Sequence, residues 1–374
     1  MEQKKIKVCH FSSVHRSDDV RIFLKECSSL AQEGFEVFLV TANSETEIVN
    51  GVQRIGVTNV TSNRFTRMLK TSKAVYKKAL SLDADIYHFH DPELLPYGLK
   101  LKRKGKKVIY DAHEDVPKQI LGKFWIPSFF RKPLAMVFRR YENYVSKRMS
   151  YIFTATPFIR DRFVLVNPNS IDINNFPLLS ELQENTNWEE KAPRVCYIGG
   201  LSKIRGIGEL MDAMDLLPEI KIDLAGNFSP ALFGTMIREK KSWRNVTEHG
   251  FVNRVETAKI MAQSKAGIVT FLPLPNHVDA QPNKMFEYMS AGIPVIGSNF
   301  PLWKDIIEKN ECGICVDPTN PLEIANAIQK VIDNDELAKK MGENGRKAVL
   351  ETYNWSIESK KLITIYKKLS GLEV

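Results

Sequence analysis

Short apolar segments alternate with amphipathic ones along the chain, and the alternation occurs twice. Strands are expected at residues 5–12, 36–42, 86–90, 107–112 and 151–155, and again at 194–198, 220–225, 265–271 and 293–297. A helical stripe at 20–31 is closed by Gly34, and another helix is expected at 208–217. Strands that alternate with helices predict two doubly wound α/β domains, each with a ligand crevice at the carboxyl ends of its strands.

The chain length fits this division. The 374 residues are too many for one typical core and suit two domains. The turn at 167–169 predicts a boundary between a first domain at 1–168 and a second at 169–352. The polar stretch 179–190 predicts an interdomain loop, and the amphipathic tail at 353–374 predicts a last helix.

Composition places the chain among globular proteins. Hydrophobic residues make up 43% and charged residues 26% of it, without an apolar run of the roughly 18 residues that cross a membrane. The first apolar run is too short for a signal peptide, so we expect a cytoplasmic protein. Cys312 and Cys315 have redox or zinc spacing, but we interpret it as coincidental because no second Cys or His pair follows nearby.

A formal net charge of +9 predicts an acidic partner: nucleic acid, a phosphorylated substrate or an anionic membrane. Residues 123–148 mix cations with aromatic residues around one acid, Glu142. Within 123–132 this mixture favours the inner face of the plasma membrane. Within 138–145 it favours a helix with aromatic residues in the core. Single-stranded nucleic acid is the third choice, because its stacking platforms usually lie on sheets.

The stretch 279–296 carries the strongest chemical pattern. Asp279 lies eight positions before Glu287, and Asn283 and Lys284 lie between them. Pro282 suits a helix start, whose free N–H groups attract an anion that Lys284 would help to neutralise. Glu287, one turn further, suits a carboxylate that binds ribose hydroxyls. The pattern predicts a nucleotide-sugar pocket.

A glycine-rich loop follows the expected strand at 194–198. Gly199 and Gly200 allow close backbone approach, and the next helix start offers N–H groups to a phosphate. Lys203 and Arg205 supply positive charge for a diphosphate. Such loops also serve as simple turns, but the helix that would carry Asn283, Lys284 and Glu287 makes phosphate binding the favoured interpretation.

Two strand ends of the first domain are rich in His and carboxylate residues. His90 and Asp91 end one strand, with His88 on the same face as His90. His113, Glu114 and Asp115 end the next, so these groups could meet as metal ligands, as acceptor-site groups, or as helix caps and supporting residues. For His88 and Asp91 the supporting role is favoured.

The first strand-to-helix loop is also charged. Asp18 or Asp19 is expected to cap the helix that follows. His15 and Arg16 are candidates for contact with an acceptor phosphate.

These motifs, in this order, resemble the retaining glycosyltransferases of family 4. Members have two Glu separated by seven residues; here Asp279 takes the first place and Glu287 the second. Arg205 matches the position of the family's diphosphate-binding lysine, whereas Gly200 stands where the family has an arginine. By the same resemblance, Gly226 and Phe251 would line the nucleotide base pocket.

The resemblance implies the GT-B fold, in which two Rossmann-like domains face each other across a cleft and the last helix crosses back to the first domain. It implies transfer of a hexosyl group from a UDP- or GDP-sugar, with retention, to a glycan or lipid-linked acceptor in cell-surface polysaccharide synthesis, without a metal or other cofactor. Arg205 and Lys284 would neutralise the leaving diphosphate, Asp279 would hold the sugar, and His113 would orient both substrates. A GT-B nucleotide-sugar epimerase and a non-catalytic partner subunit stay open as alternatives.

Overall fold

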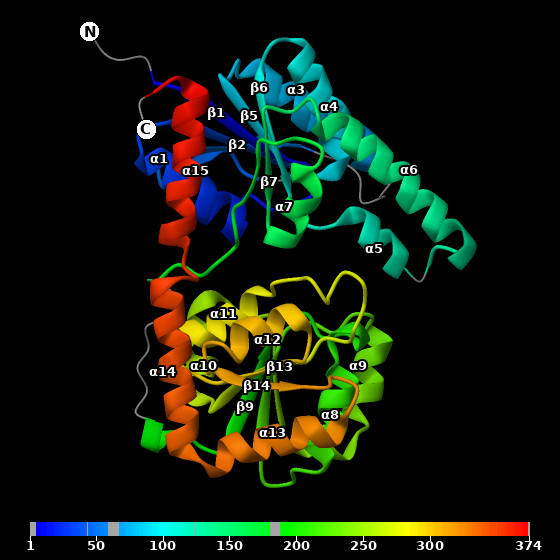
Figure 1. Cartoon of the computed structure of the whole chain (residues 1–374), viewed down its shortest axis with the longest axis vertical. Coiled ribbons are helices and arrows are strands. Elements are labelled where there is room, and N and C mark those ends of the chain that lie inside the picture. Colours follow the sequence, from blue (N-terminus) through cyan, green and yellow to red (C-terminus); the bar gives the residue numbers. More distant parts are fainter. Residues whose placement is uncertain (1–4, 43, 59–66, 124, 180–187, 373–374) are drawn as a thin grey trace. The chain divides into compact units, whose positions relative to one another are not determined.

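The computed structural model describes residues 5–42, 44–58, 67–123, 125–179 and 188–372. The chain forms two compact units, one of Met1–Asn175 with Trp355–Val374 and one of Phe176–Asn354 (Figure 1). The division falls after Asn175 and not at the predicted 168/169, because the short strand Ser170–Asp172 pairs with the sheet of the first unit. Most of the predicted interdomain loop lies outside the described residues.

The first unit is built on a sheet of eight strands in the order β3-β4-β2-β1-β5-β6-β7-β8. Its strands pair in parallel except for β3 with β4, and the direction of winding changes between β1 and β5. The strands are β1 Lys7–Ser12, β2 Glu36–Ala42, β3 Glu47–Val49, β4 Val52–Val57, β5 Ile86–Phe89, β6 Lys107–Ala112, β7 Tyr151–Thr154 and β8 Ser170–Asp172.

Helices connect these strands. They are the π-helix η1 Val20–Cys27, α1 Ser28–Gln32, the π-helix η2 Arg67–Thr71, α3 Ser72–Ser81, the 3-10 turn η3 Pro92–Leu94, α4 Leu95–Arg103, α5 Val116–Gly122, α6 Ser128–Ser146, α7 Pro157–Val164 and α15 Trp355–Ser370. The predicted stripe at 20–31 therefore starts as a π-helix, which Asp19 caps through the backbone N–H groups of Arg21 and Ile22.

The second unit has six parallel strands in the order β11-β10-β9-β12-β13-β14. The strands are β9 Arg194–Ile198, β10 Lys221–Ala225, β11 Val246–Gly250, β12 Ala266–Val269, β13 Val295–Ser298 and β14 Gly313–Val316. The helices are η4 Trp188–Glu190, η5 Lys203–Arg205, α8 Ile207–Asp215, α9 Ala231–Arg238, η6 Lys241–Asn245, α10 Arg254–Gln263, α11 Asn283–Ser290, α12 Pro301–Ile307, α13 Pro321–Asp333 and α14 Asp335–Glu351. The two sheets confirm the predicted doubly wound α/β class.

The last helix, α15, belongs to the first unit. Its Trp355 indole donates to Ser29 Oγ at 2.9 Å, and Lys367 lies 3.2 Å from a Glu33 carboxylate oxygen. Tyr366 is fully buried, and its hydroxyl lies 2.7 Å from His88 Nδ1. Helix α15 therefore packs into the core of the first unit, against β1 and β5.

Helix α6 differs from the prediction for 138–145. Phe138 packs against the core and Val145 is buried, but Tyr141 and Tyr144 are exposed by 38% and 48%. The expectation of core aromatics is wrong for these two tyrosines, because the helix buries the face that carries Glu142 and Val145. Phe124 lies outside the described residues.

One buried cation ties three segments of the first unit together. Arg21 makes three hydrogen bonds of 3.0–3.2 Å to the Asp111 carboxylate on β6, and its Nη1 donates to Ile173 O at 2.7 Å. Its Nε also lies 3.1 Å from Glu26 Oε1. Burial alone would raise the pKa of Asp111, but Arg21 and His113 outweigh it and hold that pKa well below its usual value.

Replacing this cation should be costly. Arg21→Met leaves Asp111 and Glu26 buried without their guanidinium, which should destabilise the protein by about 3–5 kcal/mol. The exposed Arg16, whose partner Asp18 is also exposed, provides the matched control, and Arg16→Met should cost below about 0.5 kcal/mol. Urea unfolding followed by circular dichroism measures both, and equal losses would contradict the role given to Arg21.

Candidate active site

In the second unit the direction of winding changes between β9 and β12, and the glycine loop follows β9. Gly199 has φ +120°, and its N–H donates to Ala225 O at 2.7 Å. A Cβ at Gly199 would lie 2.9 Å from Lys284 Nζ, so a side chain there would collide with the lysine. The loop thus brings bare backbone to the point where a doubly wound sheet usually binds its ligand.

Lys284, in the first turn of α11, is the unusual side chain of this edge. It is 7% exposed, and its ammonium has no hydrogen-bond partner within the described residues. Its Nζ lies 3.8 Å from the centre of the Tyr197 ring and 5.2 Å from that of Phe271. Burial, and then the nearby Arg205, lower the pKa of Lys284 well below its usual value. A buried amine without a partner is a site prepared for an anion.

Arg205 approaches the same loop from its other end. Its guanidinium stacks 4.8 Å from the centre of the Phe271 ring, and its Nε lies 4.0 Å from where a Cβ of residue 200 would stand. Gly206, at φ +73°, turns the chain directly after it into α8. Lys203 is exposed. The structure therefore brings Lys284 and Arg205 together beside Gly199 and Gly200.

Glu287 lies one turn along α11 from Lys284 and has a partner that the sequence did not indicate. Arg254, the first residue of α10, donates from Nη1 to Glu287 Oε1 at 2.7 Å. The side chain of Glu287 is 16% exposed. A carboxylate held in this way can still accept bonds from hydroxyl groups of a ligand. Helix α11 begins at Asn283, one residue after the predicted start at Pro282.

Asp279 lies in an irregular but well-bonded segment before α11. His277 Nδ1 lies 3.0 Å from Leu272 O, and the Trp303 indole donates to Ala280 O at 2.7 Å. Asp279 itself is partly buried. These bonds fix the backbone on both sides of the carboxylate.

The residues predicted for the base pocket follow β10 and β11. Gly226 has φ +149° and donates to Gly250 O at 2.6 Å, and a Cβ there would lie 2.0 Å from Gly199 O. Phe251 is 80% exposed. Glycines therefore end three neighbouring strands at one edge of the sheet.

In the first unit, Asp91 organises the loop after β1. It accepts from Ser12 Oγ at 2.9 Å and from the Ser13 N–H at 2.6 Å, and His15 Nε2 lies 3.6 Å away. His15 is also bonded to Asp19, and although burial alone would lower its pKa, these carboxylates raise it. Arg16 is directed instead to Asp18 at the surface.

His113 begins a chain of buried imidazoles. Its Nε2 lies 3.0 Å from Asp111 Oδ2 and 3.2 Å from His90 Nδ1, and His90 Nε2 lies 3.0 Å from His10 Nδ1. His113 is 18% exposed, whereas His10, His88 and His90 are buried. Burial lowers the pKa of each of these three, to about 4 for His90, so their rings are neutral near pH 7.

The predicted cluster of five strand-end residues does not form as one group. His90 and His113 are in contact. Asp91 instead accepts hydrogen bonds from the loop Ser12–Val14. Asp115 caps α5 through the Lys118 N–H, and Glu114 is exposed. Sequence reasoning missed His10, Glu26 and Tyr366.

Cys312 and Cys315 are free thiols whose pKa values are raised to about 12 by burial.

Family models match both halves of the chain. The model described as Glycosyltransferase Family 4 covers residues 21–173, and that described as Glycosyl transferases group 1 covers 180–348. An uncharacterized glycosyltransferase of Methanocaldococcus jannaschii is 24% identical over 72% of this chain and 69% of its own length. The capsular polysaccharide biosynthesis glycosyltransferase CapM of Staphylococcus aureus is 22% identical over 53% of this chain and about half, 52%, of its own.

Solved structures share the fold. A sucrose-phosphate synthase from Thermosynechococcus elongatus superposes with a TM-score of 0.80 and 18% identity, over 98% of this chain and 100% of that one. HepE of Anabaena, solved in complex with UDP, superposes with a TM-score of 0.72 and 14% identity, over 99% of this chain and 100% of its own. The chain belongs to the glycosyltransferases of group 1 and family 4, which have the GT-B fold.

Proposed function

We propose that this glycosyltransferase moves a hexosyl group from a nucleoside diphosphate sugar, UDP- or GDP-linked, to a glycan or lipid-linked acceptor, with retention of configuration. The observation that carries the proposal is the buried, unpartnered ammonium of Lys284 beside the Gly199–Gly200 backbone and Arg205. Two cations and bare backbone suit a diphosphate. The proposed reaction requires no metal or other cofactor, and the nucleoside diphosphate sugar is its substrate.

Charge growth on the leaving diphosphate is the step that these residues would favour. When the glycosidic bond breaks, negative charge moves onto the diphosphate oxygens. Lys284 and Arg205 would stabilise the transition state, in which this charge has grown, more strongly than the ground state. This difference lowers the barrier. Lys284 is fixed among Tyr197, Phe271 and Gly199, so it needs little reorganisation when the charge appears.

The carboxylates would position the donor. Glu287, held by Arg254, would accept hydrogen bonds from the ribose hydroxyls. Asp279 would accept hydrogen bonds from hydroxyls of the transferred sugar. Gly226 and Phe251 would contact the base, and Asn283 and Lys203 would add contacts to the diphosphate. His113, fixed by Asp111 and His90, would orient donor and acceptor.

Retention implies that the product keeps the anomeric configuration of the donor. The anomeric proton coupling in the product's NMR spectrum measures this directly. A product of opposite configuration would contradict the retaining mechanism and leave the donor site untouched.

The acceptor class rests on two considerations. CapM acts in capsular polysaccharide biosynthesis. Residues 123–148 present Trp125, Phe129 and Phe130 with 56–70% exposure among cations, while the acid Glu142 is buried and bonded to Tyr110 and Arg162. Such a surface suits an anionic bilayer, where lipid-linked acceptors reside. No helix in the described part of the chain is long and apolar enough to span a membrane. The proposed contact is peripheral, on the inner face of the plasma membrane.

Donor binding should be visible without knowledge of the acceptor. One of UDP, GDP, ADP and CDP should raise the thermal unfolding temperature, equally with and without magnesium, because cationic side chains take the place of a metal. At 100 times the dissociation constant the stabilisation is about 2.7 kcal/mol. If none of the four shifted the transition, the diphosphate site would be refuted.

Binding of that nucleotide should also be linked to protons. The pKa of Lys284 is lowered in the free protein, and a bound diphosphate raises it, so binding takes up a proton between the two values. Affinity for the nucleotide is then highest below the pKa of Lys284 in the free protein. It falls as pH rises from that value to the pKa of Lys284 in the complex. Calorimetry repeated across a range of pH above about 7.5, clear of the phosphate pKa of about 6, in buffers of different ionisation enthalpy measures the uptake.

The lysine variants provide the control. Lys284→Met should abolish the uptake and weaken binding by about 2 kcal/mol or more, roughly 30-fold. Lys259→Met removes an exposed lysine of α10 in the same unit and should change neither. Undiminished uptake in Lys284→Met would show that another group takes the proton.

The membrane proposal is tested separately. Trp125→Ser with Phe129→Ser should reduce binding to phosphatidylglycerol vesicles at least about tenfold, since each large apolar side chain contributes about 1.5–3 kcal/mol when buried. Leu232→Ser with Met236→Ser removes similarly exposed apolar side chains from α9 and should leave binding unchanged. Equal losses in a vesicle co-sedimentation assay would mean that no specific surface at 123–148 binds the bilayer.

A further inference from the structure

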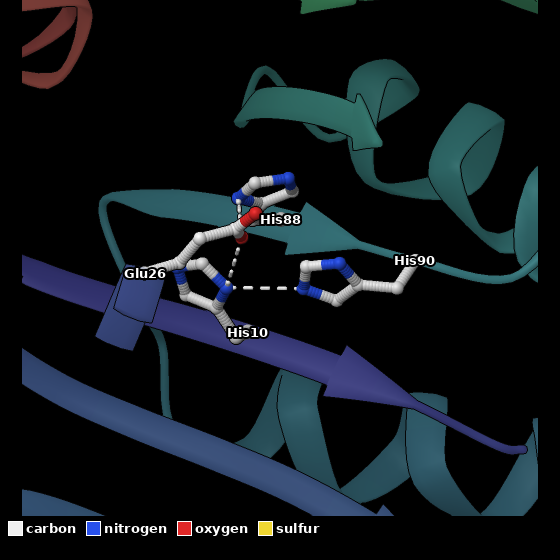
Figure 2. A group of neighbouring side chains, drawn as sticks. All are labelled: His10, Glu26, His88 and His90. Carbon is white, nitrogen blue, oxygen red and sulfur yellow. Dashed lines mark hydrogen bonds and ion pairs between the residues drawn. The ribbon is translucent and has the colours of Figure 1, made fainter. Parts of the chain in front are cut away.

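Three imidazoles and a carboxylate meet inside the first unit, and none of the four is among the residues assigned to the donor. Figure 2 shows that they face one another: His10 comes from β1, His88 from β5, His90 from just after β5, and Glu26 from the π-helix η1. His10 and His88 are opposite each other in the β1–β5 register. All four are buried, with 0–2% exposure.

The inward-facing atoms are spaced as metal ligands are. One potential ligand atom from each of the four lies within 4.8 Å of the others. His10 Nδ1 lies 3.0 Å from His90 Nε2 and 3.8 Å from Glu26 Oε2, and His88 Nδ1 lies 4.0 Å from Glu26 Oε2. Ligand atoms around a tetrahedral zinc ion with bonds of about 2.0–2.1 Å are about 3.3 Å apart. Small side-chain shifts would therefore close the site.

Two of the three outward-facing nitrogens have the oxygen partners that metal ligands usually have, whereas His88 Nε2 has no hydrogen-bond partner within the described residues. His10 Nε2 lies 3.0 Å from the Tyr366 hydroxyl, and His90 Nδ1 lies 3.3 Å from Asp111 Oδ2. His88 Nε2 lies 3.9 Å from the same carboxylate oxygen. Each ring could thus turn one nitrogen to an ion and its N–H towards an oxygen, the arrangement that fixes the tautomer of a metal-binding histidine.

The carboxylate of this cluster is incompletely satisfied. Neither oxygen of Glu26 has a hydrogen-bond partner within the described residues, although Arg21 Nε lies 3.1 Å from Oε1. Arg21 is shared with Asp111, so two buried carboxylates face one guanidinium. A cation beside Glu26 would give its oxygens the partner that they lack.

A second set of groups competes for His90. His90, Asp111 and His113 also lie close enough to hold an ion. Arg21, however, occupies the Asp111 carboxylate with three hydrogen bonds, and His113 is partly exposed. The set with Glu26 offers four buried ligands and leaves Asp111 as their outer partner.

We propose that His10, His88, His90 and Glu26 form a structural site for one divalent transition-metal ion, for which zinc is the best match. Three nitrogens and one oxygen suit zinc, and four buried ligands leave no open position for catalysis. The ion takes no part in sugar transfer; it fixes His90 and, through it, His113. On binding, the Tyr366 hydroxyl gives up its bond to His88 Nδ1 and accepts from the His10 Nε2–H.

The purified full chain tests this without any donor or acceptor. Elemental analysis should find about one zinc per chain, or the metal-stripped protein should take up one equivalent. Cobalt(II), added alone to the stripped protein, should give the intense visible absorption of a tetrahedral site and raise the thermal unfolding temperature. The wild-type measurement decides even where a variant fails to fold: no tetrahedral spectrum and no stabilisation would overturn the proposal.

Variants locate the ion. His88→Gln should abolish the cobalt spectrum, and Tyr366→Phe should weaken metal affinity about 10- to 100-fold, because an outer partner is lost. His277→Gln, a buried histidine of the second unit, should change neither. If one equivalent of metal still binds His88→Gln with the same spectrum, the ion lies elsewhere and the proposal fails. Nucleotide binding is measured independently, so failure here leaves the donor site unaffected.

Discussion

The cost of holding charge away from water is the constraint on which both units depend. In the first unit Arg21, Asp111 and Glu26 are buried together, and removing Arg21 would leave both carboxylates without their cation. In the second unit the amine of Lys284 has no hydrogen-bond partner among the described residues, and an aromatic ring lies over it. The first arrangement stabilises a fold, whereas the second leaves a demand that an anionic substrate can meet. Under the proposed function, the same physical penalty serves structure in one unit and binding in the other.

Backbone approach is what allows the second arrangement. Gly199 and Gly226 have positive φ values and lie so close together that a Cβ on Gly226 would meet Gly199 O. The lysine then fills the space that a side chain on Gly199 would need. The proposed diphosphate site therefore depends on the absence of side chains at two strand ends as much as on the presence of cations.

Much of this could be predicted from the sequence. The strands at 36–42, 107–112 and 194–198 have the predicted bounds, because uninterrupted apolar runs flanked by polar residues leave little choice of element. The π-helical start at Val20 was missed, since an apolar stripe does not distinguish a π-helix from an α-helix. Pairings between distant residues were also missed: Arg254 with Glu287, and His10 with His90, which are 33 and 80 positions apart. Local pattern marks strand ends as rich in His and Asp, but the strand order decides which of them meet.

The helix α15 gives the first unit a discontinuous chain, with Trp355–Val374 added to Met1–Asn175. Tyr366, which hydrogen-bonds with His10 and His88, is synthesised after the whole of the second unit. Ribosomal synthesis proceeds from the N-terminus, so the second unit has its whole sequence before the first one does. The buried histidines of the first unit therefore lack their tyrosine partner until the second unit has been synthesised. Of the two units, the first is thus the later one that can finish folding.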